Sequence, residues 1–314
     1  MIRFPITDLM DKTECYELLM NILHPDGLKC PNDHPLPPKQ APHDSRRMPL
    51  VDYKCRKCGH VYNIFTNTIW SGTKYDCVTI VLIIRGFTQG ITTQQLAEEL
   101  NRDYSSLLKR RHEIQKLALE NRPDEPLSDM QAEADEMFAN AGQKGEKHQD
   151  IDDPPRRRAN KLKGRGTLAN DRPPVLGVVG RHSGHLRMNV CDSVKQKVIQ
   201  PKIEHDTQEN ASIYTDECHA YKHLSETGRC HSCVNHSQGE WARDDDGDGI
   251  REVHCNTLEG IWTGLRNFLR PFRGVHKKYL AIYVVMFEWS HNLKRVNTNF
   301  LRALMIPNFT YLPI

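Results

Sequence analysis

The sequence lacks the long apolar run that a membrane-spanning helix requires. Its longest such run, Val78–Ile84, is far shorter than the roughly 20 residues needed to cross a bilayer. The beginning of the sequence does not read as a signal peptide, because Asp8 and Asp11 interrupt the stretch where an apolar core is needed. Both absences predict a protein without a membrane partner, located in the cytoplasm.

The sequence also lacks an excess of charge of either sign and has few cysteines for its length. Its 43 Lys and Arg residues nearly balance 40 Asp and Glu residues, which leaves a net charge of +3. The total charge therefore does not by itself indicate a nucleic-acid partner. Ten cysteines among 314 residues are too few for a disulfide scaffold, and in a reducing compartment closely spaced cysteines indicate a metal site.

Cysteine and histidine residues gather in two short knuckles in the first quarter of the chain. Cys30 and His34 lie in the first knuckle, and Cys55 and Cys58 form a C-x-x-C pattern in the second. Two ligands from each of two tight turns match the requirement of a tetrahedral structural zinc ion. We predict that these four residues bind Zn2+.

The fourth ligand stays open on spacing alone. Asp33 stands where a second cysteine of the first knuckle is expected, His34 follows one residue later, and His60 lies close to the second knuckle. The short strand-like segments around the knuckles bury too little apolar area to fold without a metal. We therefore expect a zinc ribbon, rich in β-structure, in residues 25–72, after an N-terminal helical segment in residues 1–24.

Residues 76–119 change to a helical pattern. The apolar segment 78–84 is followed by Gly90, by a short helical segment at 93–100, by a turn, and by a third helix from Ser105. Two short helices joined by a tight turn are typical of the all-α helix-turn-helix motif, whose second helix lies in the major groove of DNA. An ordinary helical hairpin with a solvated basic face is the alternative. The basic residues expected to face DNA are Lys109, Arg110, Arg111 and Lys116.

A linker at 120–129, rich in proline and acidic residues, separates these modules from the rest of the chain. Beyond it, residues 140–172 contain several glycines and a dense run of basic side chains. Contact with DNA phosphates is one role for such a run, and a solvated loop is the other interpretation. The basic residues concerned are Arg156, Arg157, Arg158, Lys161, Lys163 and Arg165.

The third region, residues 130–305, mixes strand-like and helical patterns, which indicates a mixed sheet with helices. The expected strands are 133–138, 175–179, 186–190 and 212–216, and the expected helices are 192–199, 257–270 and 279–289. Asp135 lies in the first strand and Asp216 ends the fourth. Glu259 and Arg266, seven residues apart, lie on the same side of the 257–270 helix.

Four segments of this region together resemble the motifs of bacterial insertion-sequence DDE transposases. They are AEADEMFANAG around Asp135, YTDECHAYKHL around Asp216, VNHSQGEW at 234–241 and HCNTLEGIWTGLRNFL at 254–269. The most similar group joins a zinc ribbon and a helix-turn-helix to an RNase H-like catalytic domain. The resemblance implies a multidomain chain with an α/β RNase H-like domain, built on a mixed five-stranded sheet, in residues 130–305.

The resemblance also implies a catalytic site. In that family, two aspartates at strand positions and an acid at the start of a helix are followed, seven residues on, by Lys or Arg. The corresponding residues are Asp135, Asp216, Glu259 and Arg266. The three acids would bind Mg2+ or Mn2+, and Arg266, where family members often have lysine, would orient a DNA phosphate. His254 and Asn256 are expected to support Glu259 or to contact DNA.

Three carboxylates suit phosphodiester chemistry, because two divalent ions about 3.5 to 4 Å apart activate the attacking oxygen and stabilise the leaving one. Mg2+ in particular prefers oxygen ligands. The resemblance thus implies a transposase that binds the terminal inverted repeats of its element, cleaves and joins double-stranded DNA, and acts as a homo-oligomer. A catalytically silent DNA-binding regulator and a nuclease without strand transfer are the alternatives.

Some of these residues also have an ordinary structural interpretation. Asn256 with Glu259 three residues later is a helix-capping pattern, and Asp135 and Asp216, taken singly, are surface acids near strand ends.

The acidic stretch 244–250 imitates the first half of a calcium loop, but the position of the bidentate glutamate holds a cysteine. We expect this stretch to be a solvated insertion.

Overall fold

The computed structural model describes residues 11–146, 165–216, 221–293 and 296–311. The chain divides into two compact units, one formed by Met1–Pro123 with Leu293–Ile314 and the other by Asp124–Asn292. Among the described residues, the helices are too short or too polar to cross a membrane.

The first unit begins with helix α1 (Lys12–Leu23), which is followed by a small antiparallel sheet. Strands β1 (Asp44–Arg47) and β3 (Val61–Tyr62) pair with the two sides of the central strand β2 (Leu50–Lys54). One of the two cysteine-bearing turns precedes β1, and the other connects β2 to β3. The sheet thus holds the second knuckle between two hydrogen-bonded strands.

Three further helices of the first unit lie where the periodicity predicts helices. They are α2 (Cys77–Thr88), α3 (Thr93–Glu99) and α4 (Tyr104–Glu120). Each begins after a side chain that accepts a hydrogen bond from a first-turn amide, as helix N-caps do. Asn101, with a φ of 48°, makes the tight turn between α3 and α4, because asparagine tolerates the left-handed conformation.

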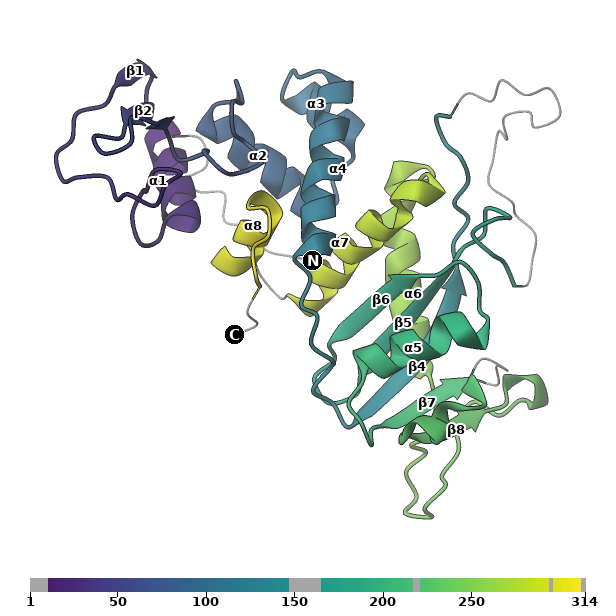
Figure 1. Ribbon diagram of the computed structural model, residues 1–314. Helices are drawn as coiled ribbons and strands as arrows, with labels where there is room; N and C mark the ends of the chain where they lie inside the picture. Colours follow the sequence, from purple (N-terminus) through teal and green to yellow (C-terminus); the bar gives the residue numbers. More distant parts are fainter. Residues whose placement is uncertain (1–10, 147–164, 217–220, 294–295, 312–314) are drawn as a thin grey trace. The chain divides into compact units, whose positions relative to one another are not determined.

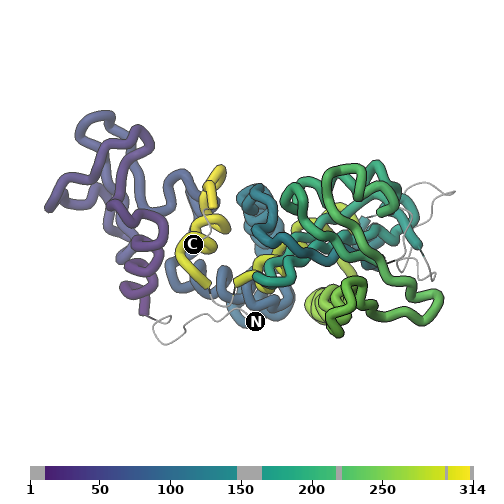
Figure 2. The backbone as a smooth tube through the Cα atoms, turned by 90° about the horizontal axis from the view of Figure 1, so that it is seen from below, coloured from purple at the N-terminus to yellow at the C-terminus, as the bar shows by residue number. Residues whose placement is uncertain are grey.

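Helix α8 (Thr298–Met305) belongs to the first unit although it follows the second unit in the sequence. It packs against α1 and α4, and the side chain of Asn121 donates to the carbonyl oxygen of Ala303 at 2.7 Å. Figures 1 and 2 both show α8, in yellow, beside helices from the first part of the chain. The expected boundary of the catalytic region at residue 305 therefore needs correction, because the apolar face of α8 is buried in the first unit.

The second unit is built on a five-stranded mixed sheet with the order β6-β5-β4-β7-β8. Strands β4 (Gln131–Phe138), β5 (Pro174–Gly180) and β6 (Leu186–Val190) are antiparallel neighbours. Strand β7 (Ser212–Asp216) runs parallel to β4, and β8 (Cys230–Val234) runs parallel to β7. The expectation of a mixed five-stranded sheet is confirmed. The sequence pattern does not mark β8, because in its residues CHSCV only the last, Val234, is a typical strand former.

Helices cover both faces of this sheet (Figure 1). Helix α5 (Gln196–Asp206) packs on one face, and α6 (Asn256–Leu269) and α7 (Leu280–Asn292) pack on the other. Helix α5 begins later than the predicted 192–199 helix and continues to Asp206. It continues because Ile199 and Ile203, four residues apart on one helix face, are both buried against the sheet.

Strand β4 directs alternate side chains to the two faces of the sheet. Ala132 and Ala134 belong to the apolar cluster on the α5 side, and Met137 belongs to the cluster on the α6 side. Glu133 and Asp135 therefore point toward α6. This register positions the acidic residues described below.

Candidate catalytic and metal-binding sites

Asp135 and Asp216 come together because β4 and β7 are parallel neighbours. Ala134 is paired with Thr215, so the two aspartates follow at the same level of the sheet. One carboxylate oxygen each of Asp135, Asp216 and Glu136 lies within 4.8 Å of the other two, and all three side chains are partly buried. Such a group offers the oxygen ligands that divalent cations such as Mg2+ prefer.

Asp135 is held by two hydrogen bonds. The indole N–H of Trp262 donates to its Oδ2 at 2.7 Å, and the backbone N–H of Glu136 donates to its Oδ1 at 2.7 Å. Burial raises the pKa of Asp135 to about 6, and the negative charges of Asp216 and Glu259 act in the same direction, while the two hydrogen bonds oppose it. Because its negative charge is disfavoured, this carboxylate gains from a nearby cation.

Glu259 and Arg266 lie on the exposed side of α6, in its first and last turns. Within the described part of the chain, Glu259 is not a member of the group formed by Asp135, Glu136 and Asp216. It lies close enough for its charge to raise the pKa of Asp135. The structure thus brings two of the three expected acids into one group and places the third nearby, on the helix that covers this face.

Glu136 takes the third place in the group, although the sequence pattern does not single it out. Its Oε2 accepts a hydrogen bond from the hydroxyl of Tyr221, which is fully buried. The available signal was adjacency to Asp135. That signal is weak, because consecutive side chains of a strand point to opposite faces of a sheet.

The start of α6 does not show the capping pattern expected at Asn256. The N-cap residue is Cys255, whose side chain makes no capping hydrogen bond, and Asn256 is an exposed first helical residue. The cap comes from β4 instead. The carboxylate of Glu133 accepts hydrogen bonds from the backbone N–H groups of Thr257 at 3.0 Å and Leu258 at 3.3 Å.

His254 contacts this same carboxylate. Its Nδ1 lies 3.2 Å from Oε1 of Glu133. The guanidinium of Arg181 also pairs with Glu133, with its Nε 3.2 Å from Oε1, and its Nη2 donates to the carbonyl oxygen of His254 at 2.8 Å. Burial and the charge of Arg181 lower the pKa of His254, and Glu133 opposes them. The contact that the structure shows for His254 is therefore with Glu133, and any support for Glu259 is indirect.

In the first unit, Cys30, His34, Cys55 and Cys58 converge. The Nδ1 of His34 lies 3.4 Å from the Sγ of Cys30 and 3.6 Å from that of Cys55, and the Sγ atoms of Cys30 and Cys58 are 3.6 Å apart. The four ligand atoms all lie within 4.8 Å of one another. Three thiols and one imidazole form a donor set found in structural zinc sites. Hydrogen bonds from backbone amides, that of Cys58 first, lower the pKa of Cys55 to about 6, whereas burial and the neighbouring thiols of Cys55 and Cys30 raise the pKa of Cys58 against a hydrogen bond from the His60 amide. The thiolate therefore forms more readily on Cys55 than on Cys58.

Asp33 and His60, the alternatives for the fourth ligand, do not join this group of described residues. The carboxylate of Asp33 pairs with Lys29 at 3.1 Å, and its side chain is 83% exposed. The two residues belong to the turns instead. Asp33 has a φ of 58°, and the carbonyl oxygen of His60 accepts the backbone N–H of Cys55 at 2.8 Å.

Arg111 is not available to face DNA, which corrects the expectation for this residue. Its side chain is fully buried. It donates to the hydroxyl of Thr93 at 2.8 Å and to the carbonyl oxygen of Ile91, and its guanidinium lies 4.0 Å from the ring centroid of Phe87. The residue therefore joins α4 to α2 and α3, and its charge is used inside the first unit.

The other basic residues of α4 differ in their exposure. The guanidinium of Arg110 lies 4.8 Å from the ring centroid of Trp70 and pairs with Glu113 at 2.8 Å. Lys109 and Lys116 are exposed and lie seven residues apart, hence on one side of the helix. These two lysines are the basic side chains of α4 best placed to meet a ligand in solution.

The second basic run is described only at its end. Arg165 is exposed. The remaining basic positions expected to contact DNA lie outside the described residues, and they are Arg156, Arg157, Arg158, Lys161 and Lys163.

The acidic segment between β8 and α6 also gathers carboxylates, those of Asp244, Asp246 and Glu252. The Asp244 carboxylate accepts the backbone N–H groups of Gly247 at 2.6 Å and Gly249 at 2.9 Å. These carboxylates therefore stabilise turns of their own segment.

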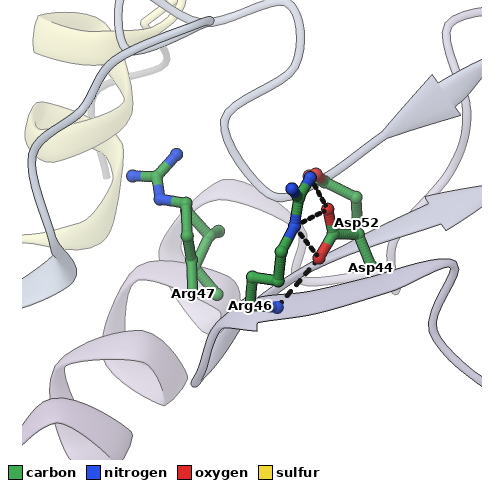
Figure 3. A pocket seen from close by; sticks show the side chains of 5 residues that line it. Asp44, Arg46, Arg47 and Asp52 are labelled. Atoms are coloured by element: carbon green, nitrogen blue, oxygen red, sulfur yellow. Dashed lines mark hydrogen bonds and ion pairs between the residues drawn. The ribbon is translucent and has the colours of Figure 1, made fainter.

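A surface pocket of about 330 Å³ lies at β1 and β2. Figure 3 shows Arg46 turned toward Asp44, with Arg47 directed away from this pair. The hydrogen bonds from Arg46 lower the pKa of Asp44 to about 2. The charges of Asp44 and Arg46 are therefore engaged with each other.

Comparison with known proteins places this chain among the transposases. The model of the ISXO2-like transposase domain matches residues 130–292, more than half of the chain. The protein therefore belongs to the ISXO2-like transposase family, which confirms the resemblance to insertion-sequence transposases and implies an enzyme of the nuclease or transferase type.

Two individual similarities accompany this match. The chain is 27% identical, over 286 residues, to an uncharacterized protein in transposable element ISH50 of Halobacterium salinarum. The matched region covers 90% of this chain and 92% of that protein. Among solved structures, a chain of the simian T-cell lymphotropic virus intasome in complex with PP2A regulatory subunit B56 gamma matches with a TM-score of 0.30 and 11% identity. That similarity covers 74% of this chain and 77% of the other.

Proposed function

We propose that the protein binds the terminal inverted repeats of an insertion sequence and catalyses metal-dependent cleavage and strand transfer of DNA. The observation that carries this proposal is the meeting of Asp135 and Asp216 on neighbouring parallel strands, beneath a helix that carries Glu259. Membership of a transposase family supports it. Because transposition joins two transposon ends to a target, we further propose that the active form is a homo-oligomer.

The acidic residues fit a divalent cation such as Mg2+ or Mn2+. Asp135, Asp216 and Glu259 would hold it, with Glu136 alongside. Burial, together with the charges of Asp216 and Glu259, raises the pKa of Asp135, and a bound cation would offset this cost of its negative charge. Bound divalent ions activate the attacking oxygen and stabilise the leaving oxygen in phosphoryl transfer. Arg266, exposed two turns after Glu259, would orient a phosphate of the DNA backbone.

The first unit would supply DNA binding. We propose that residues 25–72 form a zinc ribbon around the Cys3His group and that residues 76–119 form a helix-turn-helix. The tight turn between α3 and α4 and the exposed Lys109 and Lys116 support this assignment. Arg111 would not contact DNA, because its guanidinium is buried inside the first unit.

The experiment that tests the proposal incubates the purified full chain with labelled end DNA, a target plasmid and Mg2+ or Mn2+. We expect the wild type to nick and join the DNA, and Asp216→Asn to bind it but to do neither. Asp192→Asn, at an exposed aspartate of the same unit, is the matched control and should retain both activities.

Two outcomes would favour the alternatives. A wild type that binds end DNA tightly but neither nicks nor joins it would refute the enzymatic proposal and indicate a DNA-binding regulator. Products that are cut but never joined would indicate a nuclease without strand transfer.

A further inference from the structure

Glu133 fixes the start of α6 to the strand that carries Asp135. It lies two residues before Asp135, on the same face of β4, and its side chain is fully buried. Its carboxylate accepts the backbone N–H of Thr257 at 3.0 Å, the hydroxyl of Thr257 at 2.9 Å and the backbone N–H of Leu258 at 3.3 Å. The next residue along the helix is Glu259.

A second attachment lies one turn further along α6. The indole N–H of Trp262 donates to Asp135 at 2.7 Å. Gly177, paired with Asp135 across β4 and β5, provides the room for this ring, because a Cβ added there would lie 2.7 Å from it. The two attachments bracket Glu259, so the helix cannot shift at its first turn without breaking one of them.

The charge of Glu133 needs an explanation, because burying a carboxylate costs free energy and an apolar side chain would fill the same space. Arg181 balances the charge with its Nε at 3.2 Å, and it also donates to the carbonyl oxygens of Glu252 and His254. The pair therefore holds both the first turn of α6 and the segment that enters it. A carboxylate suits this place, since free amides and the helix dipole favour negative charge at a helix N-terminus.

We propose that Glu133 is a positioning residue, which sets the Glu259 carboxylate relative to Asp135 for the binding of a divalent cation. This inference rests on the proposed function, because it concerns the same acids. Glu133 acts through α6 and is not itself a ligand, since its carboxylate is occupied by the helix and by Arg181. Loss of such supporting contacts typically lowers metal affinity by about 10-fold to 100-fold.

The test titrates the zinc-loaded full chain with Mn2+ alone and measures affinity by calorimetry. Glu133→Gln, which keeps the volume and removes the charge, is compared in the wild-type background and in the Glu259→Gln background. We expect an affinity loss of about 10-fold or more in the first and of less than about twofold in the second, where the residue being positioned is already neutral.

Two further variants sharpen the comparison. Thr257→Val removes one hydrogen bond to Glu133 at an exposed position, so it keeps the test available if Glu133→Gln does not fold. Thr257→Val should weaken Mn2+ binding by a smaller factor than Glu133→Gln does, and it should do so in the wild-type background but not in the Glu259→Gln background. Trp262→Phe removes a donor to Asp135 itself and is therefore expected to weaken binding in both backgrounds.

The outcomes separate this inference from the proposed function. An equal loss for Glu133→Gln in both backgrounds would show that it does not act through Glu259 and would overturn the inference alone. If Asp135→Asn binds Mn2+ as tightly as the wild type does, the proposed metal site is refuted, and the inference with it.

Discussion

Replacing Asp135 by asparagine is expected to stabilise the protein above about pH 6 when no divalent cation is bound. The pKa of this carboxyl is raised to about 6, and a pKa difference of one between the folded and unfolded states corresponds to about 1.4 kcal/mol. The folded state of the wild type therefore carries a penalty of up to about 3 kcal/mol. Asparagine removes the charge and keeps an oxygen for the indole N–H of Trp262, but it loses the hydrogen bond from the backbone N–H of Glu136, so about 3 kcal/mol is the upper limit of the gain.

The pH dependence of this effect has a definite sign. The folded protein holds the Asp135 proton more tightly than the unfolded chain does, so wild-type stability falls as the pH rises from about 4 to about 6. Above that window the penalty is constant. The advantage of Asp135→Asn should therefore be absent at about pH 4, grow through the window, and be complete above about pH 6.

Thermal unfolding of the zinc-loaded full chain, followed by circular dichroism, measures this advantage. A gain of up to about 3 kcal/mol corresponds to a rise of up to about 12 °C in Tm for a unit of this size. Asp192→Asn, at an exposed aspartate, is the control and should leave Tm unchanged. Added Mn2+ should stabilise the wild type but not Asp135→Asn, and should therefore reduce the difference in Tm between them. Two results would refute the reasoning. One is that Asp135→Asn is no more stable than the wild type at pH 7.5, and the other is that its gain in stability is as large at pH 4 as at pH 7.5.

Three further predictions concern other parts of the molecule. Cys55→Ser should reduce the zinc content from one atom per chain to none by elemental analysis and lower the Tm of the first unit, because the metal completes a fold with little apolar core; undiminished zinc would contradict this. Replacing Lys109 and Lys116 by alanine should weaken DNA binding for all sequences and reduce the slope of log affinity against log salt by about one per lysine, without changing Tm; an unchanged slope would exclude them as phosphate contacts. Gly177→Ala should cost about 1 to 3 kcal/mol in urea unfolding, because its Cβ would lie 2.7 Å from Trp262. Gly260→Ala, with open space around its Cβ, should instead be neutral or stabilising.

Elements with one strong local signal could be predicted from the sequence. Strands β6 and β7 match their predicted ranges, and α6 differs by one residue at each end, because each presents a regular apolar face to the core. The family resemblance, carried by the ordered acidic motifs, is confirmed by the match to the transposase domain. The spacing of the two knuckles predicted residues that do converge in the structure.

The features that could not be predicted depend on contacts between residues distant in the sequence. Strand β8, which holds a single typical strand former, is recognised only by its pairing with β7. Arg111 looks like a solvated cation by its position in a basic run, yet it is buried because Thr93 and Ile91 lie across from it. Glu136 joins the acidic group only because β7 brings Asp216 beside it.

By itself, the sequence determined the kinds of element, the ligand types at both candidate metal sites and the family, because these depend on local periodicity, spacing and short motifs. The tertiary structure alone decided which side chains meet. Glu133 caps a helix that begins more than a hundred residues later. Helix α8 belongs to the first unit although the whole second unit lies between them in the sequence. Such pairings arise from strand order and from the burial of apolar faces, which no local pattern records.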